Sequence, residues 1–250
     1  FIIEGDGLRI AESFDGEASL APALHVTYIG ERESAASEKI RLSWGHGDDP
    51  ATAMTVIWDQ TDNAEAHVAY DRYDPAEGCV SDPAAYPMEQ APYRQTPYRG
   101  MNNYFAKLSG LAADTAYRFL IVSGDKASEC SWFRTAPAEP QALTFITGGD
   151  TKSSGNPLMA GRWSNQMVAK LRPLFVMFTG DFNSGSGVND ARWAQWLNDW
   201  ASLTKSSDGR LYPIVAVHGN HEDGDFEVLY NLFDSGNTDP AQSADYSYYG

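Results

Sequence analysis

The polar residues that follow three apolar runs of this sequence are of types that bind metal ions. They are Asp150 after Gly149, Asp181 after Gly180, and Asn220 and His221 in the run Gly219-Asn220-His221-Glu222. Carboxylate and amide oxygens suit hard or borderline divalent and trivalent cations, and imidazole suits zinc, iron or manganese. Residues of these types predict a site that holds metal, and metal in such a site suggests hydrolysis.

Each of these residues alone also has an ordinary structural explanation. An aspartate after a glycine is common in turns, and Asn220 could cap a short helix. The combination is more specific, because Asp181 follows Asp150 by 31 residues and Asn220 follows Asp181 by 39. Three unrelated turns do not readily explain three consecutive runs that each end in a potential ligand.

The elements that must position these side chains are three strands and two helices. The apolar runs at residues 143–147, 174–179 and 213–217 are predicted to be strands, with helices from about Pro157 to Leu171 and from Asp190 to Leu203 between them. This alternation is typical of a parallel sheet with right-handed crossovers. Since ligands bind at the carboxyl ends of the strands in open α/β sheets, the four polar side chains are expected at one edge.

The first half of the chain has a different periodicity. Short strands with turn signals between them are predicted at residues 39–44, 54–58, 67–70, 104–108, 116–122 and 131–135. This pattern predicts an antiparallel β-sandwich. Residues 136–140 contain two prolines among small residues and are the expected connector. The predicted organisation is an extension over 1–37, with one further strand at 23–28, a sandwich over 38–137, and an α/β domain over 141–250.

Composition limits the possible partners and the cellular location. The formal net charge of −16 argues against nucleic acid or an anionic membrane as a partner, and no apolar run reaches 18 residues. The chain starts at Phe1, which fits a cleaved signal peptide and a secreted or periplasmic protein, and fits a lost tag equally well. Cys79 and Cys130 either form one disulfide or remain two thiols, and the sequence does not decide between these.

The order of the motifs resembles the first three motifs of the calcineurin-like metallophosphoesterases, with Gly219-Asn220-His221-Glu222 as the most specific part. The purple acid phosphatase branch is the most similar one, because residues 40–44, 54–58, 108–117 and 133–137 resemble its fibronectin III-like leading domain, and Arg192-Trp193 and residues 245–250 also fit. The resemblance covers residues 38–250. It implies a fibronectin III-like β-sandwich followed by an α/β metallophosphoesterase domain of the αββα sandwich type, of which only the first half is expected in these residues.

The resemblance also implies a role for each site residue. Asp150 would ligate a first metal ion, Asp181 would bridge two, Asn220 would ligate the second, and His221 would stabilise the transition state or protonate the leaving alkoxide. Two iron, zinc or manganese ions would orient a phosphate and generate hydroxide near neutral pH. The implied function is a metal-dependent phosphoric ester hydrolase that favours small phosphomonoesters.

The sequence departs from the family pattern at three points. Ser184 stands where purple acid phosphatases have a ligating tyrosine, and Lys152 stands where related enzymes have a histidine. No histidine follows His221, although the family takes further ligands from later motifs. Lys152 is therefore either a contact for the substrate phosphate or a solvated lysine of a loop.

These departures motivate an alternative function. The protein would then be a catalytically impaired phosphoesterase-like binding or adhesion protein. A further alternative treats the sandwich as a carbohydrate- or wall-binding unit that uses Tyr86, Tyr93 and Tyr98, although tyrosines in such a loop more often pack against the protein.

Overall fold

The computed structural model describes residues 36–45, 47–151, 157–183, 188–222 and 227–236. All of them belong to one compact unit, Ala35–Gly250. The strand expected at 23–28, Lys152, Ser184 and the final motif at 245–250 lie outside the described residues. None of the described helices is long and apolar enough to cross a membrane.

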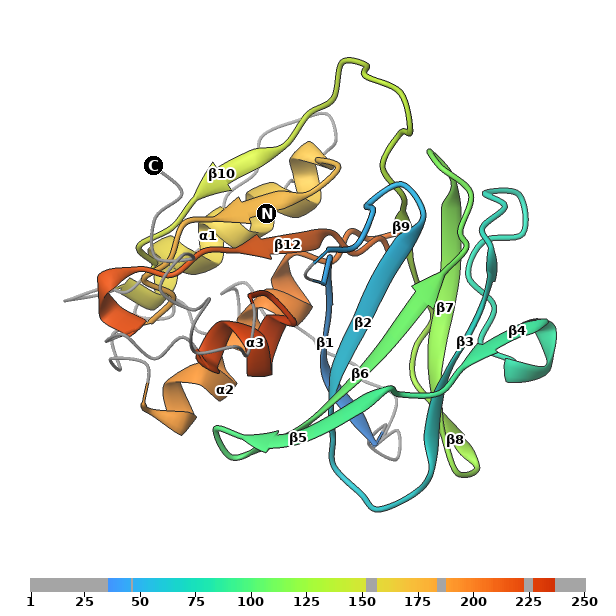
Figure 1. Cartoon of the computed structure of the whole chain (residues 1–250), viewed down its shortest axis with the longest axis horizontal. Helices are drawn as coiled ribbons and strands as arrows, with labels where there is room; N and C mark the ends of the chain where they lie inside the picture. The colour runs from blue at the N-terminus through green and yellow to red at the C-terminus, as the bar shows by residue number, and fades with distance from the viewer. Residues whose placement is uncertain (1–35, 46, 152–156, 184–187, 223–226, 237–250) are drawn as a thin grey trace, which may run out of the picture. The chain divides into compact units, whose positions relative to one another are not determined.

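The first part of the chain forms the predicted antiparallel β-sandwich (Figure 1). Its strands are β1 (Ser37–Ser43), β2 (Ala53–Gln60), β3 (Ala66–Arg72), β4 (Met88–Gln90), β5 (Arg94–Tyr98), β6 (Met101–Ser109), β7 (Ala116–Ser123), β8 (Lys126–Ala127) and β9 (Ser131–Arg134), with a 3-10 turn η1 (Pro83–Ala85) before β4. Strands β1, β2, β5 and β6 lie in one sheet, and the others lie in the second. Apolar side chains of both sheets, such as Trp58, Val68 and Phe119, form the core between them.

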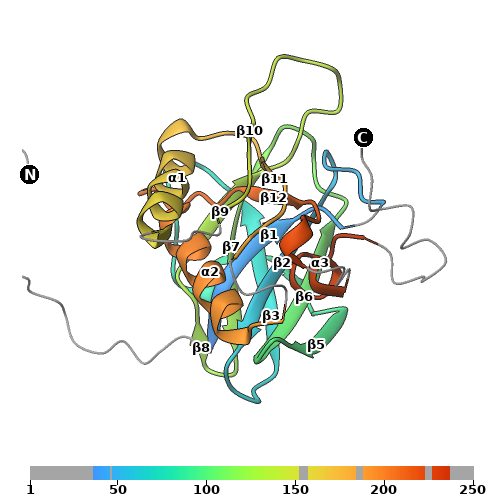
Figure 2. The same ribbon diagram turned by 90° about the vertical axis from the view of Figure 1, so that its left-hand side faces the viewer.

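The second part has the predicted strand–helix alternation. Its elements are β10 (Ile146–Gly148), α1 (Pro157–Leu171), β11 (Val176–Phe178), α2 (Asp190–Leu203), β12 (Pro213–Ala216), a 3-10 turn η2 (Asn220–Glu222) and α3 (Glu227–Phe233). The strands β10, β11 and β12 are parallel, and α1 and α2 contact each other beside them (Figure 2). The expected helix bounds are confirmed. This α/β unit confirms the predicted fold class.

The strand expected over 143–147 is wrong in its extent. Only Ile146–Gly148 form β10, while Leu143 and Phe145 before it are 47% and 46% exposed. Among the described strands, β10 pairs with β11 alone and lies at the edge of the sheet. An edge strand has hydrogen bonds on one side only, which explains why the apolar run extends beyond the ladder.

Both parts of the chain share one sheet. Within the described residues, a seven-stranded sheet runs in the order β10-β11-β12-β1-β2-β6-β5. The link is a parallel pairing of β12 with β1, in which Leu42 lies beside Pro213 and Ser43 lies beside Ile214. The domain limits given above remain a prediction, but the sheet that positions the site continues into the sandwich.

A polar junction fastens α3 to the sandwich. The Arg41 guanidinium, whose residue is 1% exposed, donates to Leu232 O at 2.6 Å and to Asn103 Oδ1 at 2.7 Å. Arg94 donates to Asp234 Oδ1 at 2.7 Å and lies 3.6 Å from the ring centre of Phe105. Helix α3 and the residue that follows it are therefore held by charges from β1 and β5.

One contact resolves an alternative that the sequence left open, because Cys79 and Cys130 form a disulfide. Three tryptophans of α2 recur at spacings of three and four residues and are buried with Phe178 and Phe182 around them: Trp193, Trp196 and Trp200.

Candidate metal and phosphate site

The loops after β10, β11 and β12 are hydrogen-bonded to one another beyond the ends of the strands. Thr179 N donates to Gly148 O at 2.8 Å, and Asp150 N donates to Gly180 O at 2.9 Å. On the other side, Val217 N donates to Phe178 O at 2.9 Å. The parallel ladder thus continues into the loops and brings the predicted residues to one edge, as the α/β pattern requires.

The glycines of the three motifs allow this close approach. A Cβ atom on Gly149 would lie 2.5 Å from Thr179 Oγ1 and 2.9 Å from Gly180 O, and one on Gly219 would lie 2.5 Å from Asp181 Oδ1. Gly180 has a positive φ of 84° and lies against the Gly219 backbone. The glycines are therefore steric requirements of the site, because any side chain would separate the loops.

The two aspartates share an unusual backbone conformation. Asp150 has φ of 55° and Asp181 has φ of 57°, which is the left-handed region that non-glycine residues rarely adopt. Such conformations are costly, and they persist where the surrounding structure and a functional requirement fix them. Asp114 and Asp234 have the same conformation in other parts of the structure, so it shows a tight turn at each strand end and is not by itself a mark of the site.

Glu222 is the residue that locks the second and third loops together. It is 1% exposed, and its carboxylate accepts hydrogen bonds from Asp181 N at 2.9 Å, Phe182 N at 3.0 Å and Gly219 N at 2.7 Å. A buried carboxylate with three backbone donors has strong charge-assisted hydrogen bonds. Glu222 was not among the predicted site residues, although its place in the most specific motif was the signal for it.

The predicted site residues differ in their exposure. Asp181 is 8% exposed, and its Oδ1 accepts a hydrogen bond of 2.7 Å from His221 N. His221 is half-buried, whereas Asp150 and Asn220 are exposed. The structure thus brings Asp181 and His221 into direct contact and joins Asp150 to them through the backbone of Gly180. Lys152 lies outside the described residues.

Two more polar side chains near the motifs were not predicted. His218 directly precedes Gly219, and Asn183 is two residues after Asp181. The atoms His218 Nε2 and Asn183 Nδ2 are buried. A second histidine in the same strand-end run was a signal that pointed to His218.

The donor set suits a metal ion in type, and the described residues alone do not complete a shell. Asp150, Asp181 and Asn220 offer carboxylate and amide oxygens, which hard and borderline cations prefer. Asp150 and Asn220 are exposed. Among the described residues, no three His, Cys, Asp or Glu side chains lie close enough together to hold a metal ion. The residues present therefore fit part of a metal site.

Fold and site together define a class of protein: a β-sandwich joined to an α/β domain with carboxylate and amide side chains at the ends of its parallel strands. Comparison with family models agrees with this class. Residues 37–135 match the purple acid phosphatase N-terminal domain, and residues 131–249 match the calcineurin-like phosphoesterases. The two matches lie side by side along the chain and support a relationship to the metallophosphoesterases.

Solved structures show the same fold at low sequence identity. The chain is similar to a structure of PhoD, with a TM-score of 0.51 and 13% identity over 77% of this chain and 41% of that one. The chain thus spans less than half the length of that structure. No curated protein sequence matches the chain.

Two β-sandwich structures align with less than half of the chain. One is a computationally redesigned β-sandwich protein, with 19% identity over 41% of this chain and 96% of that one, and a TM-score of 0.26. The other is the sensor domain of the anti-sigma factor RsgI4 of Pseudobacteroides cellulosolvens, with 13% identity over 43% of this chain and 99% of that one, and a TM-score of 0.26. Their low TM-scores carry no functional argument.

Proposed function

We propose that the protein is a metal-dependent phosphoric ester hydrolase that acts on small phosphomonoesters. The observation that carries this proposal is the hydrogen-bonded edge of three loops, which places Asp150, Asp181, Asn220 and His221 together. The match of residues 131–249 to the calcineurin-like phosphoesterases supports hydrolysis of phosphoric esters. Because the chain has a formal net charge of −16, binding of a phosphate needs local positive charge, which metal at this edge would supply.

The residues divide into ligands and a proton donor. Asp150, Asp181 and Asn220 would hold two metal ions, which when bound would neutralise phosphate charge and lower the pKa of water. Hydrolysis breaks the bond between phosphorus and the alcohol oxygen, joins a water oxygen to phosphorus, and leaves an alkoxide that needs a proton. His221, fixed by its backbone bond to Asp181 Oδ1, is the group proposed to supply that proton.

The test compares Asp181→Asn with a matched control. Asparagine keeps an Oδ1 acceptor for His221 N but loses the carboxylate charge, so hydrolysis of phenyl phosphate should fall by more than about a hundredfold while the fold is retained. Asp125→Asn makes the same change in the exposed β7–β8 turn and should leave the rate unchanged. His221→Ala should lower turnover with the bound metal retained. Full activity of Asp181→Asn, with an unchanged circular dichroism spectrum, would contradict the two-metal site.

The alternative is a phosphoesterase-like binding protein without catalysis. It is favoured by the finding that no complete metal-ligand group exists among the described residues. Metal analysis of the purified protein separates the two functions: two ions per chain support the hydrolase, and none supports the binding role. A carbohydrate-binding sandwich has less support, because Tyr86 is buried and its hydroxyl donates to Val80 O, while Tyr93 donates to Asp234.

The proposed location is outside the cytoplasm, in the periplasm or the medium. The disulfide between Cys79 and Cys130 supports it, because such bonds persist in oxidising compartments. Alkylation of thiols in freshly extracted protein tests it: no label without reductant is expected, and two labelled cysteines would contradict it.

A further inference from the structure

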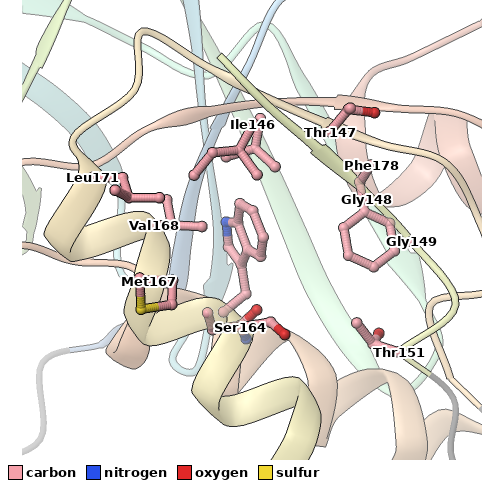
Figure 3. A pocket seen from close by; sticks show the side chains of 13 residues that line it. Ile146, Thr147, Gly148, Gly149, Thr151, Ser164, Met167, Val168, Leu171 and Phe178 are labelled. Atoms are coloured by element: carbon pink, nitrogen blue, oxygen red, sulfur yellow. The ribbon is translucent and has the colours of Figure 1, made fainter. Parts of the chain in front are cut away.

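A cavity opens between β10 and the helices, directly beside the Asp150 turn. Its volume is about 290 Å³. Figure 3 shows Val168 and Leu171 of α1 on one side and Phe178 of β11 on the other, with Gly148 and Gly149 along the β10 end. Trp200 of α2 also lines it. The cavity is therefore a gap between the edge of the sheet and the helices, adjacent to the proposed site.

The lining is apolar over most of its surface. Ile146, Val168, Val176 and Phe178 contribute aliphatic and aromatic groups, and the partly exposed Leu171 stands beside them. Engineered apolar cavities of about 150 Å³ hold benzene, and small-molecule pockets begin at about 300 Å³. The cavity therefore has room for one ring with a substituent.

A buried polar side chain of α1 lines the cavity. Asn165 is 6% exposed and is part of this lining. On the neighbouring wall the hydroxyl of Thr151 is already engaged, because Trp196 Nε1 donates to Thr151 Oγ1 at 3.0 Å and Thr151 Oγ1 donates to Phe182 O at 2.8 Å. The Asn165 amide is therefore the polar group of the lining that we expect a ligand to contact.

The cavity and the proposed site share a segment of backbone. Gly149 and Thr151, the two neighbours of Asp150, both line the cavity. A molecule whose ring lies in the cavity can therefore place a group attached to that ring at the edge that carries Asp150. This continuity connects the apolar space with the oxygen ligands.

We propose that this cavity binds the organic group of the ester substrate, a ring-sized apolar group whose ester oxygen hydrogen-bonds to the Asn165 amide. The proposal rests on the proposed function, and it names the class of ester that the site prefers. Aryl phosphates fit this description, and short alkyl phosphates do not fill the cavity.

The first experiment measures binding of phenol, the alcohol part of phenyl phosphate, by ligand-observed NMR, with no turnover required. Asn165→Leu should weaken phenol binding about three- to tenfold, the range for one lost hydrogen bond. Gln166→Leu makes the same kind of change at the adjacent exposed position of α1, outside the cavity, and should bind phenol like the wild type. Val168→Phe fills the space and should abolish binding, and circular dichroism of both cavity variants reports folding.

The second experiment compares kcat/KM for phenyl phosphate and ethyl phosphate. Phenyl phosphate has the better leaving group, so its uncatalysed hydrolysis sets a baseline ratio of the two rates. The ratio of the two kcat/KM values for the wild type should exceed that baseline. Asn165→Leu should reduce this excess, and Gln166→Leu should retain it. Phenol binding that is absent, or equal in all folded variants, would overturn the cavity proposal, as would hydrolysis with the same preference in every variant. Phenol binding that depends on Asn165 without hydrolysis of either ester would instead overturn the proposed function.

Discussion

Two buried charged residues of this protein lie in regions that differ in the exposure of their polar neighbours. Glu222 and Arg41 are each 1% exposed, and each binds mainly to backbone atoms. Glu222 contacts the buried Asp181, and two further polar side chains of the same edge, Asp150 and Asn220, are exposed. Around Arg41 the neighbouring polar side chains are already hydrogen-bonded within the junction, since Asn103 accepts from Arg41 and Asp234 accepts from Arg94.

This difference distinguishes the candidate site at the strand ends from the polar junction at α3. In both regions a buried charge fixes the local geometry through hydrogen bonds to the backbone, which Glu222 accepts and Arg41 donates. Of these two regions, only the edge at the strand ends leaves carboxylate and amide groups at the surface, where a ligand can reach them. The density of charged residues is therefore a poor guide to function in this chain, and the exposure of their neighbours is the better one.

Of the changes that compare these two regions, Glu222→Gln should have the largest effect on activity. The amide offers one oxygen to three backbone donors, and its NH₂ group faces at least one of them, so the loops of Asp181 and Gly219 should separate. We expect a loss of about 2–3 kcal/mol in the free energy of unfolding and a fall in phenyl phosphate hydrolysis of about a hundredfold. Urea unfolding and steady-state kinetics measure both. Unchanged activity would show that Glu222 does not position the site.

Arg41→Met should lower the stability of the protein and leave its activity nearly unchanged. It leaves Leu232 O and Asn103 Oδ1 without their buried donor, so we expect a loss of about 2–4 kcal/mol of stability, measured by urea unfolding. Activity per folded molecule, scored below the unfolding transition, should change little. A large loss of kcat with unchanged stability would show that the polar junction acts on catalysis, and would contradict its separation from the candidate site.

The smallest effect is expected from Tyr93, whose hydroxyl donates to Asp234 Oδ2 at 2.5 Å. Burial, followed by the bond to the Asp234 carboxylate, raises the pKa of Tyr93. The unfolded chain releases this proton near pH 10, so the stability that Tyr93 contributes is complete below pH 10 and is lost as the pH rises above it. The Tyr93→Phe variant should therefore lose less stability than the wild type between pH 9 and 11 in urea unfolding. Parallel curves for the two proteins would contradict this.

Local sequence patterns predicted the parts of the fold that depend on neighbouring residues. The helices over 157–171 and 190–203, the buried tryptophans and the order of strands agree with their periodicity. Strands β4, β5 and β8 were not predicted, because two of them have only three and two residues and β5 contains Pro97 at the other edge of the sheet.

Pairings between distant segments left no local signal. The parallel register of β1 with β12 joins residues from opposite ends of the described chain, so periodicity could not reveal it. For the site, glycine–aspartate pairs predicted which residues gather, but not the three hydrogen bonds to Glu222 or the place of His218. These depend on how loops meet in space.

The shared sheet also has a consequence for the order of folding during synthesis. Strand β1 pairs with β2 on one side and with β12 on the other, and β12 is the last strand of the described chain to be made. The sandwich can form from near-neighbour antiparallel pairings before β12 leaves the ribosome. Until then β1 has an open edge, and that edge is a preformed template on which β12, the strand that leads to Asn220 and His221, is aligned when it emerges.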